Sequence, residues 1–552
     1  MFGLTPTEPY KSSQRYLNGT NVLQTQFSTT TGTCRTTDFM PLYSRLDGTL
    51  TELHQIVRHV QCIQGQMQLS VSFVPRPDYG RAEIALHVEE SQVTCHWRDG
   101  ALTLTTPTKL HPSGSEASGQ FKLKAKQEAV FVLTYSDSSS PGYDDNLTPT
   151  DRQDATVAFW RNIAADSAYQ GPWREEVERS YLALHLLNYV ASGAIVAAPT
   201  TSLPEAIGGV RNWDYRYTWL RDAAFTVEAL MSLGHLEEAS RFFMWLERIC
   251  ARDGVGLGTM YKVDGERDLQ EAELTHLRGY RDSQPVRIGN DAAYLVQLDI
   301  YGEVLGSAAE LAKVGVPPSD GQWELLRTLA NLAAARWKEP DSGIWEVRGG
   351  PYHFVYSKVM CWVALDKAVR LAQDTGRADA ETEAWKRELL AVKEEVLTKG
   401  WSERKQAFVQ HYETDAMDAS NLLIPLMGFL PADDPRVVST VERIQAELGY
   451  GPFLYRYKTD ETDDGLVGTE GAFTLCSFWL VRVLAQMGRA EEAQILFEQL
   501  LTVASPLGLY AEMVDPQSKE ALGNYPQAFT HIGLILAVQA LRQNHTALEE
   551  MP

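Results

Sequence analysis

The stretch from Gly208 to Asp222 reads GGVRNWDYRYTWLRD, and the rest of the chain can be understood by working outward from it. It sets four aromatic residues among charged ones: Trp213, Tyr215, Tyr217 and Trp219 among Arg211, Asp214, Arg216, Arg221 and Asp222. Pyranose faces carry C–H groups that lie on aromatic rings, whereas their hydroxyl edges need directional, charge-assisted hydrogen bonds. The mixture indicates a sugar-binding surface, although the start of an amphipathic helix with an aromatic cluster at a domain boundary would look similar.

Length and charge narrow the class of protein. The chain has 552 residues, 44% hydrophobic and 22% charged, which is an ordinary globular composition with room for two or more domains. The formal net charge of -22 disfavours nucleic acid as a partner, because such binding depends on clustered lysines and arginines. A neutral ligand is the natural expectation.

No cofactor, metal or membrane segment is expected from the sequence. The six cysteines form no C-x-x-C pair and no zinc-ligand spacing, so we expect free, mostly buried thiols. The opening MFGLTPTEPYKSSQR lacks the basic and apolar regions of a signal peptide, and no window approaches the roughly 18 apolar residues of a spanning helix. A cytoplasmic protein is therefore expected. A calcium ion on loop carboxylates stays open, though no ligand spacing requires one.

The first 135 residues show the period of β-strands. Apolar and polar residues alternate at 67–73, MQLSVSF, and at 121–126, FKLKAK, and turn-rich breaks separate such runs. We predict an antiparallel β-sandwich over residues 1–135. Its role is expected to be structural, with a carbohydrate-binding module as the less favoured alternative.

A change of composition follows the predicted sandwich. Residues 136–150 read SDSSSPGYDDNLTPT, which is too polar to pack alone, and we assign residues 136–172 to a linker. From residue 173 onward apolar residues recur every three or four positions, as in Val177, Tyr181, Leu184 and Leu187. Residues 173–552 are therefore predicted to form a helical domain.

The predicted helices, about twelve of them, are arranged in pairs. Three junctions resemble one another, each with a glycine that suits a left-handed helix end and acidic residues in the next first turn: Gly234, Gly376 and Gly488. Six helical hairpins fit either an open solenoid or a closed ring. Long polar loops favour a ring with a pocket at one rim. These loops are 200–217, 252–290, 338–356, 402–417, 449–468 and 503–525.

Two of these loops carry a glutamate beside aromatic or apolar residues. Residues 341–348 read DSGIWEVR and contain Glu346, and residues 508–516 read GLYAEMVDP and contain Glu512. Apolar neighbours desolvate a carboxyl group and raise its pKa, as a general acid near neutrality requires. Hydrolysis of a glycosidic bond needs two such carboxyl groups in distinct roles. Taken singly, however, most glutamates are solvated surface residues.

These motifs, together with GTEGAFTLCSFWLV at 468–481 and PVRIGN at 285–290, resemble glycoside hydrolase family 15 in its bacterial and archaeal form. The resemblance covers roughly residues 20–545. It implies an N-terminal β-sandwich followed by an (α/α)6 barrel of the six-hairpin glycosidase type. It also implies inverting exo-hydrolysis that releases β-glucose from the non-reducing ends of α-glucosides.

The resemblance assigns roles to individual residues. Glu346 matches the general acid and Glu512 the general base, whose carboxyl groups in an inverting enzyme stand about 6.5 to 9.5 Å apart. The residues it assigns to the glucose pocket are Tyr215, Trp219, Arg221, Asp222, Trp345 and Arg287. Met513 departs from the family, since many relatives have a polar residue after the base, so substrate preference can differ.

Several functions stay open from sequence. The first is an inverting exo-α-glucosidase of glucoamylase type, and the second is a trehalase of the same family that uses the same two glutamates. A catalytically silent sugar-binding protein and a phosphorylase are less favoured, because both glutamates are present. Glu470 fits either a helix start or a ligand contact. The preferred linkage and the oligomeric state are not determined by the sequence.

Overall fold

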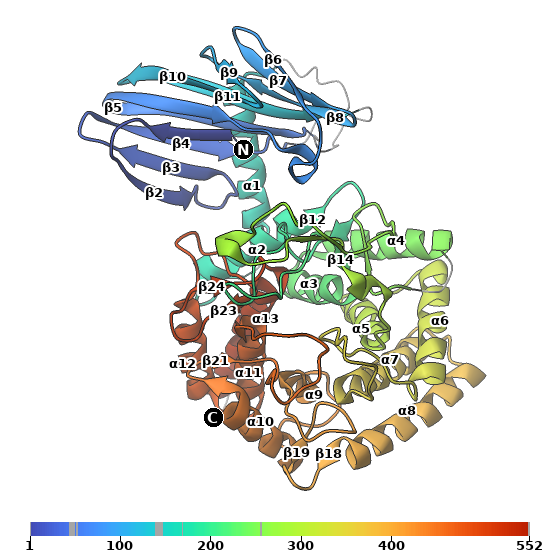
Figure 1. Ribbon diagram of the computed structural model, residues 1–552. Helices are drawn as coiled ribbons and strands as arrows, with labels where there is room; N and C mark the ends of the chain where they lie inside the picture. Colours follow the sequence, from blue (N-terminus) through green and yellow to red (C-terminus); the bar gives the residue numbers. More distant parts are fainter. Residues whose placement is uncertain are drawn as a thin grey trace. The chain divides into compact units, whose positions relative to one another are not determined.

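The computed structural model describes residues 2–43, 50, 53–137, 147–167, 169–253 and 257–549. They belong to two compact units, Met1–Asp166 and Ser167–Pro552. The first unit is built of antiparallel strands and the second of helices, as expected (Figure 1).

The first unit contains eleven strands within its described residues. They are β1 (Phe2–Pro6), β2 (Lys11–Tyr16), β3 (Leu23–Ser28), β4 (Gly32–Phe39), β5 (Gln55–Phe73), β6 (Ala85–Val88), β7 (Gln92–Trp97), β8 (Gly100–Thr105), β9 (His111–Ser113), β10 (Glu116–Lys124) and β11 (Glu128–Ser136). One layer has the order β2-β3-β4-β5-β11-β8-β7-β6, and β1, β10 and β9 extend the other half of β5. All pairings are antiparallel.

The long strand β5 joins the two layers. Its first half pairs with β4 and β11, and its second half pairs with β1 and β10. Gly65 separates the halves with φ of 69°, and a Cβ there would lie 2.2 Å from the carbonyl oxygen of Thr31. The alternation predicted at 67–73 is confirmed, because Met67, Leu69 and Val71 are buried in the core of this unit.

The interval 136–172, expected to be a linker, contains a helix. Helix α1 (Pro149–Ala165) starts with a capping box between Thr148 and Asp151 and belongs to the first unit. Its buried residues Thr156, Trp160 and Ala164 recur every four positions and form only a narrow stripe in a polar segment. That stripe is too narrow to stand out in the sequence pattern. Residues 138–146 and 168 of this interval lie outside the described residues.

The second unit is a ring of paired helices (Figure 1). Its inner helices are α3 (Leu220–Ser232), α5 (Asp299–Lys313), α7 (Val355–Asp374), α9 (Leu423–Leu426), α11 (Thr474–Gln486) and α13 (Ala528–Glu549). Each packs against the next, and α13 packs against α3. The outer helices are α2 (Arg174–Leu187), α4 (Leu236–Asp253), α6 (Asp320–Arg336), α8 (Ala380–Lys399), α10 (Pro435–Leu448) and α12 (Ala490–Leu501). The ring is therefore a closed (α/α)6 barrel and not a solenoid.

Glycines end three of the inner helices as the sequence predicts. Gly234, Gly376 and Gly488 have φ of 95°, 69° and 76° and follow α3, α7 and α11. This left-handed conformation favours glycine and turns the chain back toward the outer helix.

Short strand pairs fasten the loops of the barrel. They are β12 (Asn188–Tyr189) with β13 (Ala194–Ile195), β14 (Thr218–Trp219) with β15 (Met260–Tyr261), β16 (Ala272–Glu273) with β17 (Arg287–Ile288), β18 (Trp401–Ser402) with β19 (Ala407–Phe408), β20 (Gly449–Tyr450) with β21 (Phe453–Leu454), and the triplet β22 (Ala472–Phe473), β23 (Met513–Val514) and β24 (Ala521–Leu522). Met513 is buried within the triplet, where an apolar side chain suits its surroundings.

The surface and the cysteines have ordinary features. Free, buried thiols are found at Cys34, Cys62, Cys95, Cys361 and Cys476, and the side chain of Cys250 lies outside the described part.

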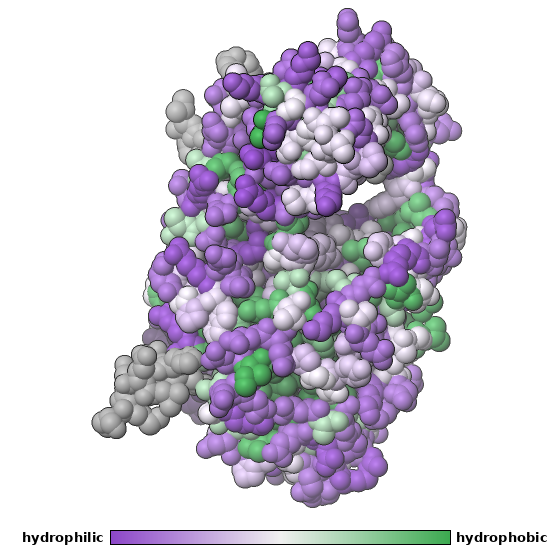
Figure 2. Space-filling view, turned by 90° about the vertical axis from the view of Figure 1, so that its left-hand side faces the viewer, coloured by the Kyte–Doolittle hydropathy of each residue, from purple (hydrophilic) through white to green (hydrophobic). Residues whose placement is uncertain are grey.

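On the face seen in Figure 2, hydrophilic residues predominate and hydrophobic ones are scattered among them. Among the described helices, none combines the length and the apolar character needed to cross a membrane.

Candidate active site

One cavity in the helical unit gathers most of the site residues predicted from sequence. It is lined by Ala197, Tyr215, Trp219, Arg221, Asp222, Ile344, Trp345, Glu346, Arg456, Phe473, Glu512, Gln527 and Phe529. Four of the six long loops contribute to it, namely 200–217, 338–356, 449–468 and 503–525. The sequence prediction of a pocket built from several rim loops is thereby confirmed for these four.

Glu512 is the more deeply buried of the two glutamates, with 1% of its surface exposed. The hydroxyl of Tyr215 donates to Oε1 at 2.7 Å, and the backbone N–H of Asn524 donates to Oε2 at 3.3 Å. Burial raises the pKa of Glu512 to about 7, although the Tyr215 hydrogen bond and the charge of Arg456 lower it. This carboxyl group can therefore exchange a proton near neutral pH.

Gly523 lets the backbone approach the Glu512 carboxyl group closely. Its φ is 73°, and a Cβ at this position would lie 2.4 Å from Oε2 of Glu512. Any larger residue would displace the carboxyl group from the donors that hold it.

Glu346 lies in a different environment. The indole N–H of Trp219 donates to Oε1 at 2.8 Å, and Nη1 of Arg221 donates to the same oxygen at 3.4 Å. The side chain is 18% exposed. Its backbone has φ of 58°, a left-handed conformation that costs energy for a residue with a Cβ and that neighbouring contacts must hold.

Arg221 and Asp222 form a buried ion pair at the wall of the cavity. Nε of Arg221 donates to Oδ1 of Asp222 at 2.9 Å, and Nη1 donates to the carbonyl of Ile344, two residues before Glu346. Burial raises the pKa of Asp222 to about 6, while Arg221 acts in the opposite direction. The pair offers fixed, charge-assisted hydrogen bonding to polar groups in the cavity.

Aromatic rings form the apolar part of the lining. Tyr215 and Trp219 pack edge to face with ring centroids 5.4 Å apart. Trp345 packs against Phe473 at 5.4 Å, and its indole N–H donates to Asp418 at 2.9 Å. A cavity with aromatic walls and a buried ion pair suits a sugar ring.

Arg456 is a lining residue that sequence reasoning missed. Its guanidinium group makes two hydrogen bonds to Glu470, of 2.7 and 2.6 Å, and the residue is buried. Glu470 thus anchors this arginine and does not itself line the cavity. The signal in the sequence was slight: an arginine between two tyrosines in the predicted rim loop 449–468.

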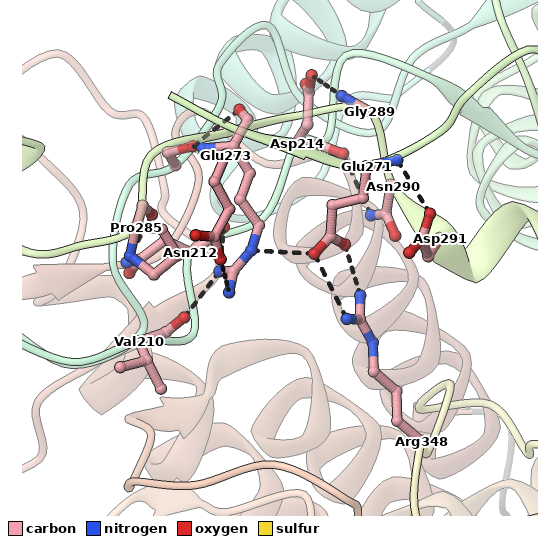
Figure 3. Close-up of polar contacts among 12 residues, drawn as sticks. Val210, Asn212, Asp214, Glu271, Glu273, Pro285, Gly289, Asn290, Asp291 and Arg348 are labelled. Atoms are coloured by element: carbon pink, nitrogen blue, oxygen red, sulfur yellow. Dashed lines mark hydrogen bonds and ion pairs between the residues drawn. The ribbon is translucent and has the colours of Figure 1, made fainter. Parts of the chain in front are cut away.

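Arg287 does not line the cavity, contrary to expectation. Its Nη1 donates to the carbonyls of Val210 at 2.8 Å and Asn212 at 3.2 Å, and its Nε pairs with Glu271 at 3.0 Å (Figure 3). These contacts use the guanidinium group to fasten the loops 200–217 and 252–290 to each other. Among the described residues, no three His, Cys, Asp or Glu side chains come together in a way that could hold a metal ion.

Comparisons with known proteins agree with this geometry. Residues 171–539 match the family model described as glycosyl hydrolases family 15, and residues 1–160 match one described as trehalase-like, N-terminal. A trehalase of Mycolicibacterium smegmatis is 40% identical over 96% of this chain and 82% of its own length. A trehalase of Thermoplasma acidophilum is 34% identical over 98% and 92%.

A solved structure supports the fold. A bacterial glucoamylase complexed with acarbose superposes with a TM-score of 0.74 at 12% identity, covering 97% of this chain and 86% of the other. At that identity the likeness shows the fold alone. The family model spans most of the chain and the two trehalases match almost all of it, so the chain belongs to glycosyl hydrolase family 15 and is a glycoside hydrolase.

Proposed function

We propose that this protein is a trehalase that cleaves its substrate with inversion, with Glu346 as general acid and Glu512 as general base. The observation that carries the proposal is that both glutamates line one cavity in unlike surroundings. Glu346 is partly exposed and meets two donors at one oxygen, whereas Glu512 is buried beside Tyr215. Glycosidic hydrolysis needs two carboxyl groups whose environments separate their roles.

Each glutamate has a defined part in the proposed reaction. Protonated Glu346 gives its proton to the glycosidic oxygen as the bond to the anomeric carbon breaks. Ionised Glu512 takes a proton from a water molecule, whose oxygen attacks that carbon from the opposite face. The hydroxyl of Tyr215 favours the ionised form of Glu512, because it donates a hydrogen bond to it.

The remaining lining residues are proposed to hold the glucose that is attacked. Arg221 and Asp222 would bind its hydroxyl groups, and Tyr215, Trp219 and Trp345 would pack against its ring. Arg456 joins this set, since it lines the same cavity. Arg287 is left out of the proposed substrate contacts because its guanidinium group faces other partners.

Trehalose is proposed as the substrate because relatives named trehalase match nearly the whole chain at 34% to 40% identity. A glucoamylase-type activity is the alternative; the superposition on a bacterial glucoamylase concerns the fold and does not choose between the two substrates. Both activities would use the same two glutamates. They differ in the sugar that must fit on the leaving side of the cavity.

The anomers of the released glucose test the proposal. Purified protein is incubated separately with trehalose, maltose and isomaltose, without phosphate, and early products are followed by proton NMR. An inverting trehalase gives equal amounts of α- and β-glucose from trehalose, since only the attacked ring inverts. Faster cleavage of maltose or isomaltose would favour the glucoamylase type, and α-glucose alone from trehalose would exclude inversion.

A further inference from the structure

A cluster of three charged side chains and one indole, none of which lines the cavity, contacts both loops that carry the proposed catalytic glutamates. We call it the Glu271 cluster, and it consists of Glu271, Arg287, Arg348 and Trp213. Oε1 of Glu271 pairs with Nε of Arg287 at 3.0 Å, and Oε2 accepts from Nη2 of Arg348 at 2.7 Å (Figure 3). The two guanidinium carbons lie 4.7 and 4.5 Å from the ring centroid of Trp213. One carboxylate thus holds two arginines against one indole.

Arg348 connects the Glu271 cluster to the segment of the acid. It follows Glu346 by two residues, and its backbone N–H donates to the carbonyl of Asp464 at 2.8 Å. Glu346 has a left-handed backbone, which persists only where surrounding contacts hold it. The main-chain bond to Asp464 and the side-chain bond to Glu271 are such contacts, immediately after Glu346 in the chain.

Trp213 connects the cluster to the segment of the base. Its carbonyl accepts a hydrogen bond from the side-chain amide of Asn524 at 3.0 Å. The backbone N–H of the same asparagine donates to Glu512. Because Arg348 packs on the Trp213 ring, the cluster lies between the acid segment and the base segment.

Of the two carboxylates near Arg287, Glu271 is the more buried and makes the closer ion pairs. Its side chain is 11% exposed and bonds both arginines, whereas Glu273 is 54% exposed and lies 3.7 Å from Arg287. Exposed ion pairs contribute little, and removing one partner of a buried pair leaves an uncompensated charge. Glu273 is therefore a matched control on the same loop.

We infer that Glu271 is a positioning residue that, through Arg348, holds Glu346 in place for proton donation. The inference rests on the proposed function, in which Glu346 is the acid. Glu271 does not line the cavity and has no part in bond making. Misplacing the general acid slows the hydrolysis of substrates with a poor leaving group, such as the second glucose of trehalose. It hardly affects one whose leaving group needs little protonation, such as α-glucosyl fluoride.

The test compares Glu271→Gln and Arg348→Met on these two substrates. We expect kcat on trehalose to fall about 10- to 100-fold with KM nearly unchanged, and kcat on α-glucosyl fluoride to fall less than about threefold. The double variant should lose no more than the worse single variant, because both changes break the same contact. Glu273→Gln should leave both rates unchanged.

A reference variant separates this inference from the proposed function. Glu346→Gln should show the same preference for the fluoride, more strongly; if it does not, the assignment of the acid is wrong. If it does and Glu271→Gln loses equally on both substrates, the positioning role of Glu271 is wrong. Circular dichroism checks that each variant folds. If Glu271→Gln does not fold, the same comparison of substrates is made with Arg348→Met. The Arg348 side chain is partly exposed, so its replacement is less disruptive to the fold.

Discussion

At the scale of residues, the two glutamates differ in what surrounds their oxygens. Glu512 is buried among Tyr215, Arg456 and the backbone of Asn524, whereas Glu346 meets Trp219 and Arg221 and stays partly exposed. Such unlike surroundings let two chemically identical groups take opposite roles.

Glu512→Gln removes the proposed base while preserving the shape of the side chain. We expect kcat on trehalose to fall about 10³-fold with KM changed little, because a neutral amide cannot take a proton from water. Steady-state kinetics with a glucose assay measure it. Glu498→Gln, on the exposed face of α12, is the control, and hydrolysis by Glu512→Gln near the wild-type rate would remove Glu512 from the mechanism.

The pH dependence reports the ionisation of Glu512. Its pKa is raised to about 7, so kcat/KM should rise as the pH passes upward through 7 and the base loses its proton. Tyr215→Phe removes a donor that favours the ionised form, so the pKa should rise and the acidic limb should move to higher pH. Tyr217→Phe, which loses a hydrogen bond to Asp214 instead, should not move that limb. A shift to lower pH in Tyr215→Phe would contradict this account.

Gly523 and Gly488 form a matched pair for a third prediction. Both have positive φ, so each change to alanine should cost about 1 to 2 kcal/mol of unfolding free energy. Only at Gly523 would the added Cβ meet Glu512, whereas the space around Gly488 is open. Thermal denaturation should show a loss for both variants, larger for Gly523→Ala because its Cβ also collides with Glu512, and only Gly523→Ala should lose most of its activity. Equal activities would show that the close approach at Gly523 is unimportant.

At the scale of elements, the parts predicted well are those encoded locally. The strand at 67–73 and the helix ends at Gly234, Gly376 and Gly488 depend on residues near one another in sequence. Helix α1 was missed because its buried stripe is narrow and its segment polar. Hydrophobic periodicity reflects only residues close in sequence, so it predicts elements with a clear local pattern and misses one, such as α1, whose pattern is weak.

The site was predicted from motifs, which supply residue identity but not the direction of a side chain. Seven of the eight site residues do line the cavity. Arg287 lies in one of those motifs yet faces Glu271 and the carbonyl of Val210, and no local pattern distinguishes the two orientations. Arg456 was missed because its partner Glu470 is defined only by the folded loops.

At the scale of the whole molecule, closure of the barrel brings segments from both ends of the helical unit to one cavity. Helix α13 packs against α2, α3, α11 and α12, so the last inner helix touches both the first and the preceding hairpins. Two residues at its start line the cavity: Gln527 directly precedes the helix, and Phe529 lies in its first turn. Stability of the ring and integrity of the site therefore depend on the same helix.

A core variant in α13 tests that dependence. Ile535 is fully buried, and Ile535→Ala should lower the unfolding free energy of the helical unit by about 2 to 5 kcal/mol. Leu390→Ala, at an exposed position of α8, should change it by less than about 0.5 kcal/mol. Urea denaturation followed by circular dichroism measures both, and near-equal values would show that α13 adds little to the closed ring.

The residues that line the cavity come from segments far apart in the sequence. Tyr215 and Glu512 are hydrogen-bonded across 297 residues of chain, and Gln527 and Phe529 come later still. A polypeptide emerging from the ribosome thus contains Tyr215, Trp219 and the proposed acid Glu346 well before the proposed base Glu512. Contacts so remote in sequence are slow to form. If the proposed roles hold, we expect sugar cleavage only after the final inner helix has docked, because Gln527 and Phe529 complete the cavity.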